Sequence, residues 1–303
     1  MIDIASETRL MMGTDVMVRA AGDAEGVAVR SALDRMATIA VKFDAFNPES
    51  PLFHFNHHGT PLVDQEIIGL TARGLEISRA SAGAFDMTVA PLLELWGFNG
   101  TPSIPAEKDI RDALLYVGCC HLEIKAGQLM KDVPGVRINL GGIAKGYALA
   151  EAVRVLKEHG IVSALVDAGG DICVIGRNGE RLWNIGIRDP YGESVAGSVA
   201  VENMAVMGSG DYERFFIQDG RRYHHILDPR TGYPSEGVAA VTVIHPDPVQ
   251  AQAWSKVPFV LGPRKALGLM ERAGMAVVVI FSSGEMACSN SMRNGFLSKN
   301  AGN

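Results

Sequence analysis

Residues 222–232 (Arg-Tyr-His-His-Ile-Leu-Asp-Pro-Arg-Thr-Gly) concentrate side chains that can take part in proton transfer and polar catalysis. An imidazole such as that of His225 can accept a proton near neutral pH. Asp228 with the following proline is typical of the start of a bend, and Gly232 can supply a positive φ. We therefore expect a strand that delivers His225 to a turn, where it meets Asp228 and Thr231. His224 points to the opposite face of such a strand, so the histidine pair does not predict a shared metal.

A glycine turn forms the second candidate site, in residues 139–146 (Asn-Leu-Gly-Gly-Ile-Ala-Lys-Gly). A turn of this kind before a helix can direct backbone N–H groups and one lysine at phosphate oxygens. It is not a Walker loop, because Lys145 precedes Gly146 and no serine or threonine follows the lysine. Phosphate binding and an ordinary turn both remain open on this segment alone.

The third candidate is the segment 81–98, in which small residues precede Phe85 and Asp86. Glycine and alanine at this point would allow a planar ligand to approach the backbone closely. A glycine turn followed by a helix start capped near Thr88 explains the same residues equally well.

The elements that position these segments follow from hydrophobic periodicity and turn residues. Predicted strands are 8–20 with a bend at Gly13, 136–140, 163–166, 183–187, 199–207, 214–217, 238–244 and 275–281. Predicted helices are 23–43, 64–79, 106–117, 143–159, 248–261 and 263–273, and residues 43–61 are predicted to be a loop. Residues 136–166 have the length of a βαβ unit. Because helices and strands alternate irregularly, we expect an α+β fold. A mixed β-sheet would carry helices on its faces, and residues 1–303 would form a single domain of two intertwined lobes.

Composition excludes several classes of protein. The 28 lysines and arginines against 34 aspartates and glutamates give a net charge of −6, which offers no overall field for nucleic acid. An apolar content of 47% with 20% charged residues is that of a globular protein. The four cysteines form no C-x-x-C pair and are expected to be reduced. We find no signal-peptide pattern or transmembrane segment, so the chain as given is expected to be cytoplasmic.

Together these segments resemble the ApbE family of FAD:protein FMN transferases, which attach FMN through a phosphoester to a threonine of a target flavoprotein. The resemblance covers most of the chain and keeps the order of the family's motifs. The matching pieces are Met12-Gly13-Thr14, residues 43–56 with Ser50 and Asn56, 83–88, 96–98, 140–146, 168–171, 209–212, 225–232 and 259–262.

The resemblance implies a set of site residues. Those expected along FAD are Met12, Phe46, Ala84, Phe85, Asp86, Asn139 and Lys145. The family commonly has tyrosine at the position of Phe46 and aspartate at that of Asn139. His225 and Asp228 would lie at the reacting pyrophosphate with Thr231 beside them, and His225 would accept the proton of the attacking threonine hydroxyl.

The metal site is where the sequence departs from the family. The resemblance implies Mg²⁺ bound by a backbone carbonyl of the glycine turn, here Gly142, and by an aspartate and a threonine four residues apart. This chain has Gln252 and Lys256 at those two positions. An ammonium cannot ligate Mg²⁺, so we expect Lys256 to take roughly the place of the ion and to contact the FAD pyrophosphate.

Three functions follow from these patterns. The first is FMN transfer from FAD to a protein threonine with release of AMP. The second is an FAD-binding protein of the same family that lacks transferase activity, because Gln252 and Lys256 replace the usual metal ligands. The third is an inert scaffold, which would not require Lys145, His225 and Asp228.

Overall fold

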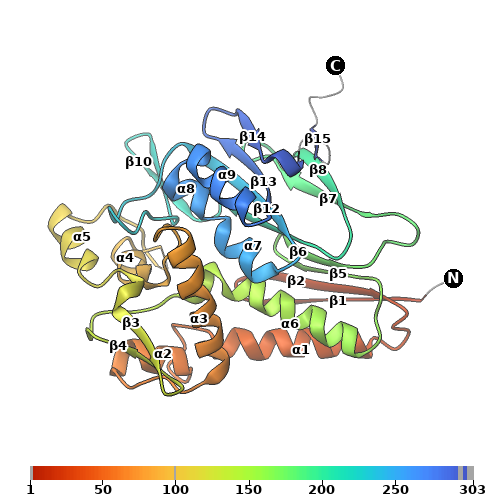
Figure 1. Ribbon diagram of the computed structural model, residues 1–303, viewed down its shortest axis with the longest axis horizontal. Coiled ribbons are helices and arrows are strands. Elements are labelled where there is room, and N and C mark those ends of the chain that lie inside the picture. The colour runs from red at the N-terminus through yellow and green to blue at the C-terminus, as the bar shows by residue number, and fades with distance from the viewer. Residues whose placement is uncertain (1–2, 99, 293–295, 299–303) are drawn as a thin grey trace.

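An eight-stranded antiparallel sheet forms the centre of the computed structural model, which describes residues 3–98, 100–292 and 296–298 (Figure 1). Neighbouring strands from one edge to the other are β1 (Ile4–Met11), β2 (Thr14–Ala21), β5 (Ala164–Ala168), β6 (Asp171–Ile175), β9 (Ala205–Gly210), β12 (Val238–His245), β13 (Ala276–Phe281) and β14 (Met286–Cys288). Segments from both ends of the sequence therefore build one sheet. The predicted α+β class, with helices packed on a sheet, is confirmed.

Both faces of the sheet are covered. On one face lie the helices α1 (Val27–Lys42), α6 (Ala144–Glu158) and α7 (Pro248–Trp254), of which α6 contacts both of the others. On the other face, a small sheet of β7 (Trp183–Arg188), β8 (Val195–Val201) and β15 (Phe296–Ser298) packs through Trp183 and Val199 against Val206, Ile244 and Val278. Because it is covered on both sides, β12 is buried at seven successive positions rather than at alternate ones.

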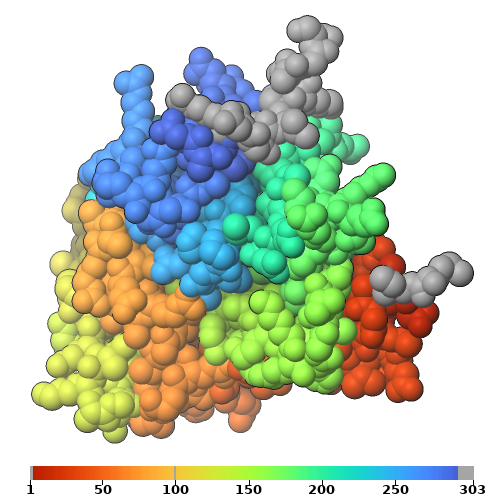
Figure 2. All heavy atoms as spheres, turned by 45° about the vertical axis from the view of Figure 1, so that its right-hand side comes forward, coloured from red at the N-terminus to blue at the C-terminus, as the bar shows by residue number. Residues whose placement is uncertain are grey.

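α7 is buried except at Gln250, and it contacts α3 (Gln65–Ala80) and α6. In Figure 2 the light-blue surface beside the start of α7 adjoins the orange and light-green segments. The chain continues from α7 into α8 (Val257–Leu261) and α9 (Pro263–Arg272), and α9 packs against β13. No helix among residues 3–98, 100–292 and 296–298 is both long and apolar enough to cross a bilayer.

A second group of elements lies beside the sheet, at the lower left of Figure 1. It comprises α2 (Pro51–His58), α3, α4 (Ala90–Leu95), α5 (Glu107–Leu114), β3 (Leu122–Lys125) and β4 (Gln128–Lys131). The hairpin of β10 (Phe215–Gln218) and β11 (Arg221–His224) leads into this group, since Leu227 packs with Trp96 and Ile110. Trp96 Nε1 also donates a hydrogen bond of 2.8 Å to the Gly232 carbonyl. The segment that carries His225 is thus one of the places where the two groups meet, in addition to the core that they share.

The prediction of a strand at 136–140, and with it the βαβ unit, is wrong. These residues are irregular and end in a 3₁₀ turn, Leu140–Gly142. The alternating burial of Val136, Ile138 and Leu140 resembles that of a strand. The neighbour of Ile138, however, is a side chain: Asn56 donates through Nδ2 to the Ile138 carbonyl and accepts from its N–H, both at 2.9 Å. The buried amide thus replaces a partner strand.

The predicted loop 43–61 contains the helix α2. Ser50 caps its first turn by accepting the Phe53 N–H at 3.0 Å, Pro51 begins it, and Gly59 ends it with φ 68°. The proline and glycine that suggested a loop mark the two ends of a helix instead.

Two longer predicted elements are divided in the structure. The predicted strand 199–207 becomes β8 and β9, which turn at Asn203 and belong to different sheets. The predicted helix 248–261 becomes α7 and α8, and Pro258 stands near the start of the second helix. The predicted strand 275–281 is β13, and it is not an edge strand, because it pairs with β14 on its outer side.

We expect Asn56→Ala to lower the free energy of unfolding by roughly 2–4 kcal/mol, because it leaves the N–H and carbonyl of Ile138 buried without partners. Urea denaturation would measure the change. The control is Asn184→Ala on the exposed side of β7, where a change within about 0.5 kcal/mol is expected. Equal stability of the two variants would contradict the role given to Asn56.

Candidate active site

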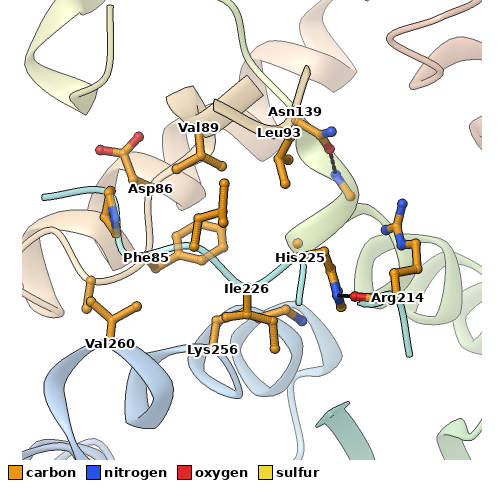
Figure 3. A pocket seen from close by; sticks show the side chains of 15 residues that line it. Phe85, Asp86, Val89, Leu93, Asn139, Arg214, His225, Ile226, Lys256 and Val260 are labelled. Atoms are coloured by element: carbon orange, nitrogen blue, oxygen red, sulfur yellow. Dashed lines mark hydrogen bonds between the residues drawn. The ribbon is translucent and has the colours of Figure 1, made fainter. Parts of the chain in front are cut away.

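A pocket lies where four segments meet: the turn after α3, the glycine turn before α6, the β10–β11 hairpin with its following turn, and the junction of α7 and α8 (Figure 3). Its lining residues are Ala84, Phe85, Asp86, Val89, Leu93, Asn139, Gly141, Gly142, Arg214, His225, Ile226, Leu227, Pro229, Lys256 and Val260. The cavity measures about 120 Å³, whereas sites that bury a drug-sized ligand usually measure ~300–1,000 Å³. It can therefore enclose only part of a larger ligand.

His225 enters the pocket directly after the end of β11. The hairpin register, with Phe215 opposite His224, brings Arg214 opposite His225. The Arg214 carbonyl accepts the His225 N–H at 3.0 Å and lies 3.2 Å from His225 Nδ1. We assign the proton to Nδ1, which donates to that carbonyl and leaves Nε2 able to accept a proton.

Burial is the main reason that the pKa of His225 falls to about 3, and the Arg214 guanidinium lowers the pKa further. At neutral pH the ring is therefore uncharged. Its neighbour His224 faces the other way, as predicted. His224 Nε2 donates to the Ser235 carbonyl at 2.8 Å, and burial also lowers the pKa of this ring. The two histidines have different roles, one in the pocket and one in the core.

The glycine turn is held by side-chain and backbone hydrogen bonds. Asn139 Oδ1 accepts the Gly141 N–H at 2.7 Å, and the Asn139 N–H donates to the Met87 carbonyl at 2.8 Å. A Cβ at Gly142 would lie 3.1 Å from the ring of Phe85. The absence of a side chain at this position lets the turn approach the opposite wall of the pocket.

Lys145 forms an ion pair with the buried carboxylate of Asp171 and does not line the pocket. Asp171 also accepts the Gly208 N–H at 2.9 Å. The charge of Lys145, the lysine of the glycine turn, is thus already neutralised by a carboxylate at the start of β6.

Phe85 forms one wall of the pocket, but the carboxylate of Asp86 is engaged elsewhere. Asp86 Oδ1 accepts the Thr88 N–H at 2.7 Å, and Oδ2 accepts the Cys119 N–H at 3.1 Å. Asp86, rather than Thr88, caps the short helix that begins at Met87. Asp86 therefore lines the pocket while its carboxylate fixes the turn.

Asp228 and Thr231 lie close to the pocket but do not line it. Asp228 Oδ2 forms an ion pair of 2.6 Å with Arg230, whose guanidinium also donates to the Val260 carbonyl at 2.9 Å. The Thr231 hydroxyl is exposed and accepts the Tyr233 N–H at 3.3 Å. These contacts fix the turn after His225 against α8.

Met12 and Phe46 also lie outside the pocket lining. Met12 occupies the β1–β2 turn with φ 52°. Phe46 is 54% exposed in the segment between α1 and α2. Of the predicted site residues, those that line the pocket are Ala84, Phe85, Asp86, Asn139, Gly142, His225 and Lys256. Those that lie outside the lining are Met12, Phe46, Lys145, Asp228 and Thr231.

The residues present do not fit the Mg²⁺ site implied by the resemblance. Gln252 Oε1 already accepts the Gly146 N–H at 2.7 Å, and its Nε2 donates to the Gly141 carbonyl at 3.2 Å. The Lys256 ammonium lies 2.8 Å from the Gln252 carbonyl. A hard divalent ion prefers oxygen ligands that include a carboxylate, and a neighbouring ammonium would repel it.

Sequence reasoning missed Arg214 as part of the site. The signal was available in Asp219-Gly220, a dipeptide typical of two-residue hairpin turns. Both residues have positive φ in the structure, at 52° and 75°. Counting outward from this turn pairs position 214 with 225. The apolar residues Val89, Leu93 and Val260 lie in segments that the sequence analysis singled out, but their place in the lining was not predicted.

The sequence model of the ApbE family matches residues 12–280. Among curated proteins, the FAD:protein FMN transferase of Treponema pallidum is 33% identical, in an alignment that covers 91% of this chain and 84% of the relative. The protein of the same name from Salmonella typhimurium is 31% identical over 281 residues, which cover 86% and 80%.

Solved structures agree over nearly the full length. The ApbE protein of Thermotoga maritima superposes with a TM-score of 0.91 at 34% identity and covers 97% of this chain and 99% of its own. The apo form of the flavinyl transferase ApbE of Pseudomonas stutzeri gives 0.87 at 33% identity, with 97% of each chain covered.

The lowered pKa of His225 predicts acid sensitivity. Its ordinary pKa of 6.5 falls to about 3 on folding, so the unfolded chain binds more protons between these values. The stability that the neutral ring contributes is full above pH 6.5 and is lost as the pH falls toward 3. Chemical denaturation between pH 6.5 and pH 3 measures the loss of unfolding free energy. This loss should be smaller for His225→Gln than for the parent protein. The control is His54→Gln, at an exposed position of α2, which should lose as much stability as the parent. An unchanged pH dependence in His225→Gln would refute this prediction.

Proposed function

The chain belongs to the ApbE family, and on that premise we propose that it moves FMN from FAD to a threonine of a target flavoprotein and releases AMP. The sequence-based identification of the family, and of an enzyme of the transferase class, is confirmed by the family match and by the names of the relatives. Those relatives are named as transferases, which gives no support to the alternative of an FAD-binding protein without activity.

The reaction breaks the phosphoanhydride bond between the FMN and AMP halves of FAD and forms a phosphoester bond between FMN and threonine. The hydroxyl oxygen of the acceptor threonine attacks the phosphorus of the FMN half of FAD, and the bond from that phosphorus to the bridging oxygen breaks. That oxygen leaves with AMP, and the hydroxyl proton passes to a base. The observation that carries the proposal is the meeting of His225 with the glycine turn in one pocket of a chain from this family.

His225 is suited to accept the proton, because its Nδ1–H is held by the Arg214 carbonyl and its Nε2 is left as the acceptor. In the unliganded protein a pKa of about 3 makes it a weak base. A bound pyrophosphate would bring negative charge beside the ring, offset the effect of Arg214, and raise the pKa toward the working pH. Substrate binding would thus activate the base.

We propose that the FAD-binding surface extends beyond the pocket. The small cavity would enclose the reacting part of FAD, and the remainder would lie along more open surface. The residues proposed to contact FAD are Met12, Phe46, Ala84, Phe85, Asp86, Asn139, Lys145 and Lys256, with Asp228 and Thr231 beside His225 at the reacting group. Because the lining runs from Ala84 to Val260, we propose that residues 1–303 act as one FAD-binding domain.

The test is incubation of the purified protein with FAD and a peptide that carries a threonine in a Ser-Gly-Ala-Thr stretch, the acceptor type that the family resemblance implies. Mass spectrometry should detect FMN on the threonine, and chromatography should detect an equal amount of AMP. Bound FAD with neither product would refute the transferase activity. Dialysis that showed no preference for FAD over ATP or NAD would refute the assignment of the pocket.

We expect His225→Ala to reduce turnover by about 10²–10⁴-fold while FAD affinity changes little, because a proton acceptor acts mainly in the transition state. AMP release at saturating FAD measures the first quantity, and a flavin fluorescence titration measures the second. His58→Ala, on the exposed side of α2, is the control. Equal losses of affinity and turnover would instead make His225 a positioning residue.

A further inference from the structure

Lys256 is a cation without a carboxylate partner in the part of the chain that the structure describes. Its Nζ donates to the Gln252 carbonyl at 2.8 Å and to Ser255 Oγ at 3.2 Å, and both acceptors are neutral. An ammonium has three N–H donors, so one is left over. The nearby carboxylate of Asp171 is already paired with Lys145 and with the Gly208 N–H.

The surroundings make this arrangement unfavourable in the empty protein. Lys256 lies in the pocket wall, and burial lowers its pKa to about 8. The charge of Asp171 opposes this shift, and the charge of Lys145 adds to it. A cation withdrawn from water with no carboxylate in direct contact destabilises a fold unless something else compensates for it. An anion in the pocket would supply that compensation.

Gln252 performs a second task at the same place. Its side chain is 1% exposed and bridges the Gly146 N–H and the Gly141 carbonyl. A carboxylate at this position could accept from Gly146 but could not donate to Gly141. The amide therefore holds the glycine turn against α7 by hydrogen bonds alone, in the place where the family resemblance implies a bound ion.

We propose that Gln252 and Lys256 form a metal-independent phosphate anchor, in which Gln252 fixes the glycine turn and Lys256 supplies positive charge to the pyrophosphate of FAD. This inference rests on the proposed function, since it assumes that FAD is the ligand. One ammonium replaces a divalent ion, so FAD binding requires no Mg²⁺.

The experiment is a flavin fluorescence titration of the full chain with FAD, in buffer with EDTA and in buffer with Mg²⁺. The two dissociation constants should agree within about twofold. Lys256→Met should weaken FAD binding by about tenfold or more, the usual effect of losing a charge-assisted hydrogen bond to phosphate. Riboflavin, which has no phosphate, should bind both proteins alike. Lys265→Met, at an exposed position of α9, is the control and should bind FAD like the parent.

A merely structural role for Lys256 predicts different results. If the ammonium only ties Gln252 to Ser255, Lys256→Met should lower the melting temperature of the unliganded protein and leave FAD affinity unchanged, which would overturn the proposal. The anchor predicts an equal or higher melting temperature, because an uncompensated cation is removed. Lys256→Arg keeps the charge and should recover part of the affinity. Equal weakening of FAD and riboflavin binding would also overturn the proposal.

The reverse change gives an independent check. Gln252→Asp combined with Lys256→Thr installs the ligand types that the resemblance implies, and FAD binding should then become sensitive to EDTA. If the unmodified protein binds FAD only with Mg²⁺, the anchor is refuted and the proposed function stands. If FAD binds in neither buffer, the proposed function fails and the anchor fails with it.

Discussion

The close approach of α6 and α7 is the constraint on which the pocket depends. A Cβ at Gly146 would lie 2.4 Å from the Pro248 carbonyl oxygen, so only glycine allows the two helices this separation. The amide of Gln252 then reaches both ends of the glycine turn. With α7 fixed in this way, its continuation places Lys256 at the pocket. A larger residue at position 146 would displace the turn, the helix and the lysine together.

Burial shifts the pKa values of two ionisable groups that line the pocket, His225 and Lys256. His225 is neutral at pH 7, whereas Lys256 stays charged although its burial disfavours the charged form. The charge of Lys145 is balanced by the carboxylate of Asp171. Both pKa changes are in the direction that an incoming anion would reverse. The unliganded site is therefore less stable than its contacts could make it, which is typical of a site prepared for a charged ligand.

The sequence predicted the parts of the site that depend on local patterns. A histidine at a strand end, a glycine turn before a helix, and the ordered motifs of a family were all readable from neighbouring residues. The irregular segment 136–140 was not, because its backbone is satisfied by Asn56, about eighty positions earlier in the chain. The break before Val257 was also missed, since the apolar spacing continues across it. What escaped prediction was decided by contacts between distant residues, which hydrophobic periodicity does not record.

The order of the sheet has a consequence for how the protein is made. β2 pairs with β5, about 150 residues further along, and the pocket wall runs to Val260. Contacts this far apart in sequence form slowly, because a long loop must close before they contribute. No stretch of nascent chain that stops short of Lys256 contains the complete site. The pocket can therefore form only after residue 260 has been synthesised, and shorter fragments must be kept from aggregating without help from a ligand.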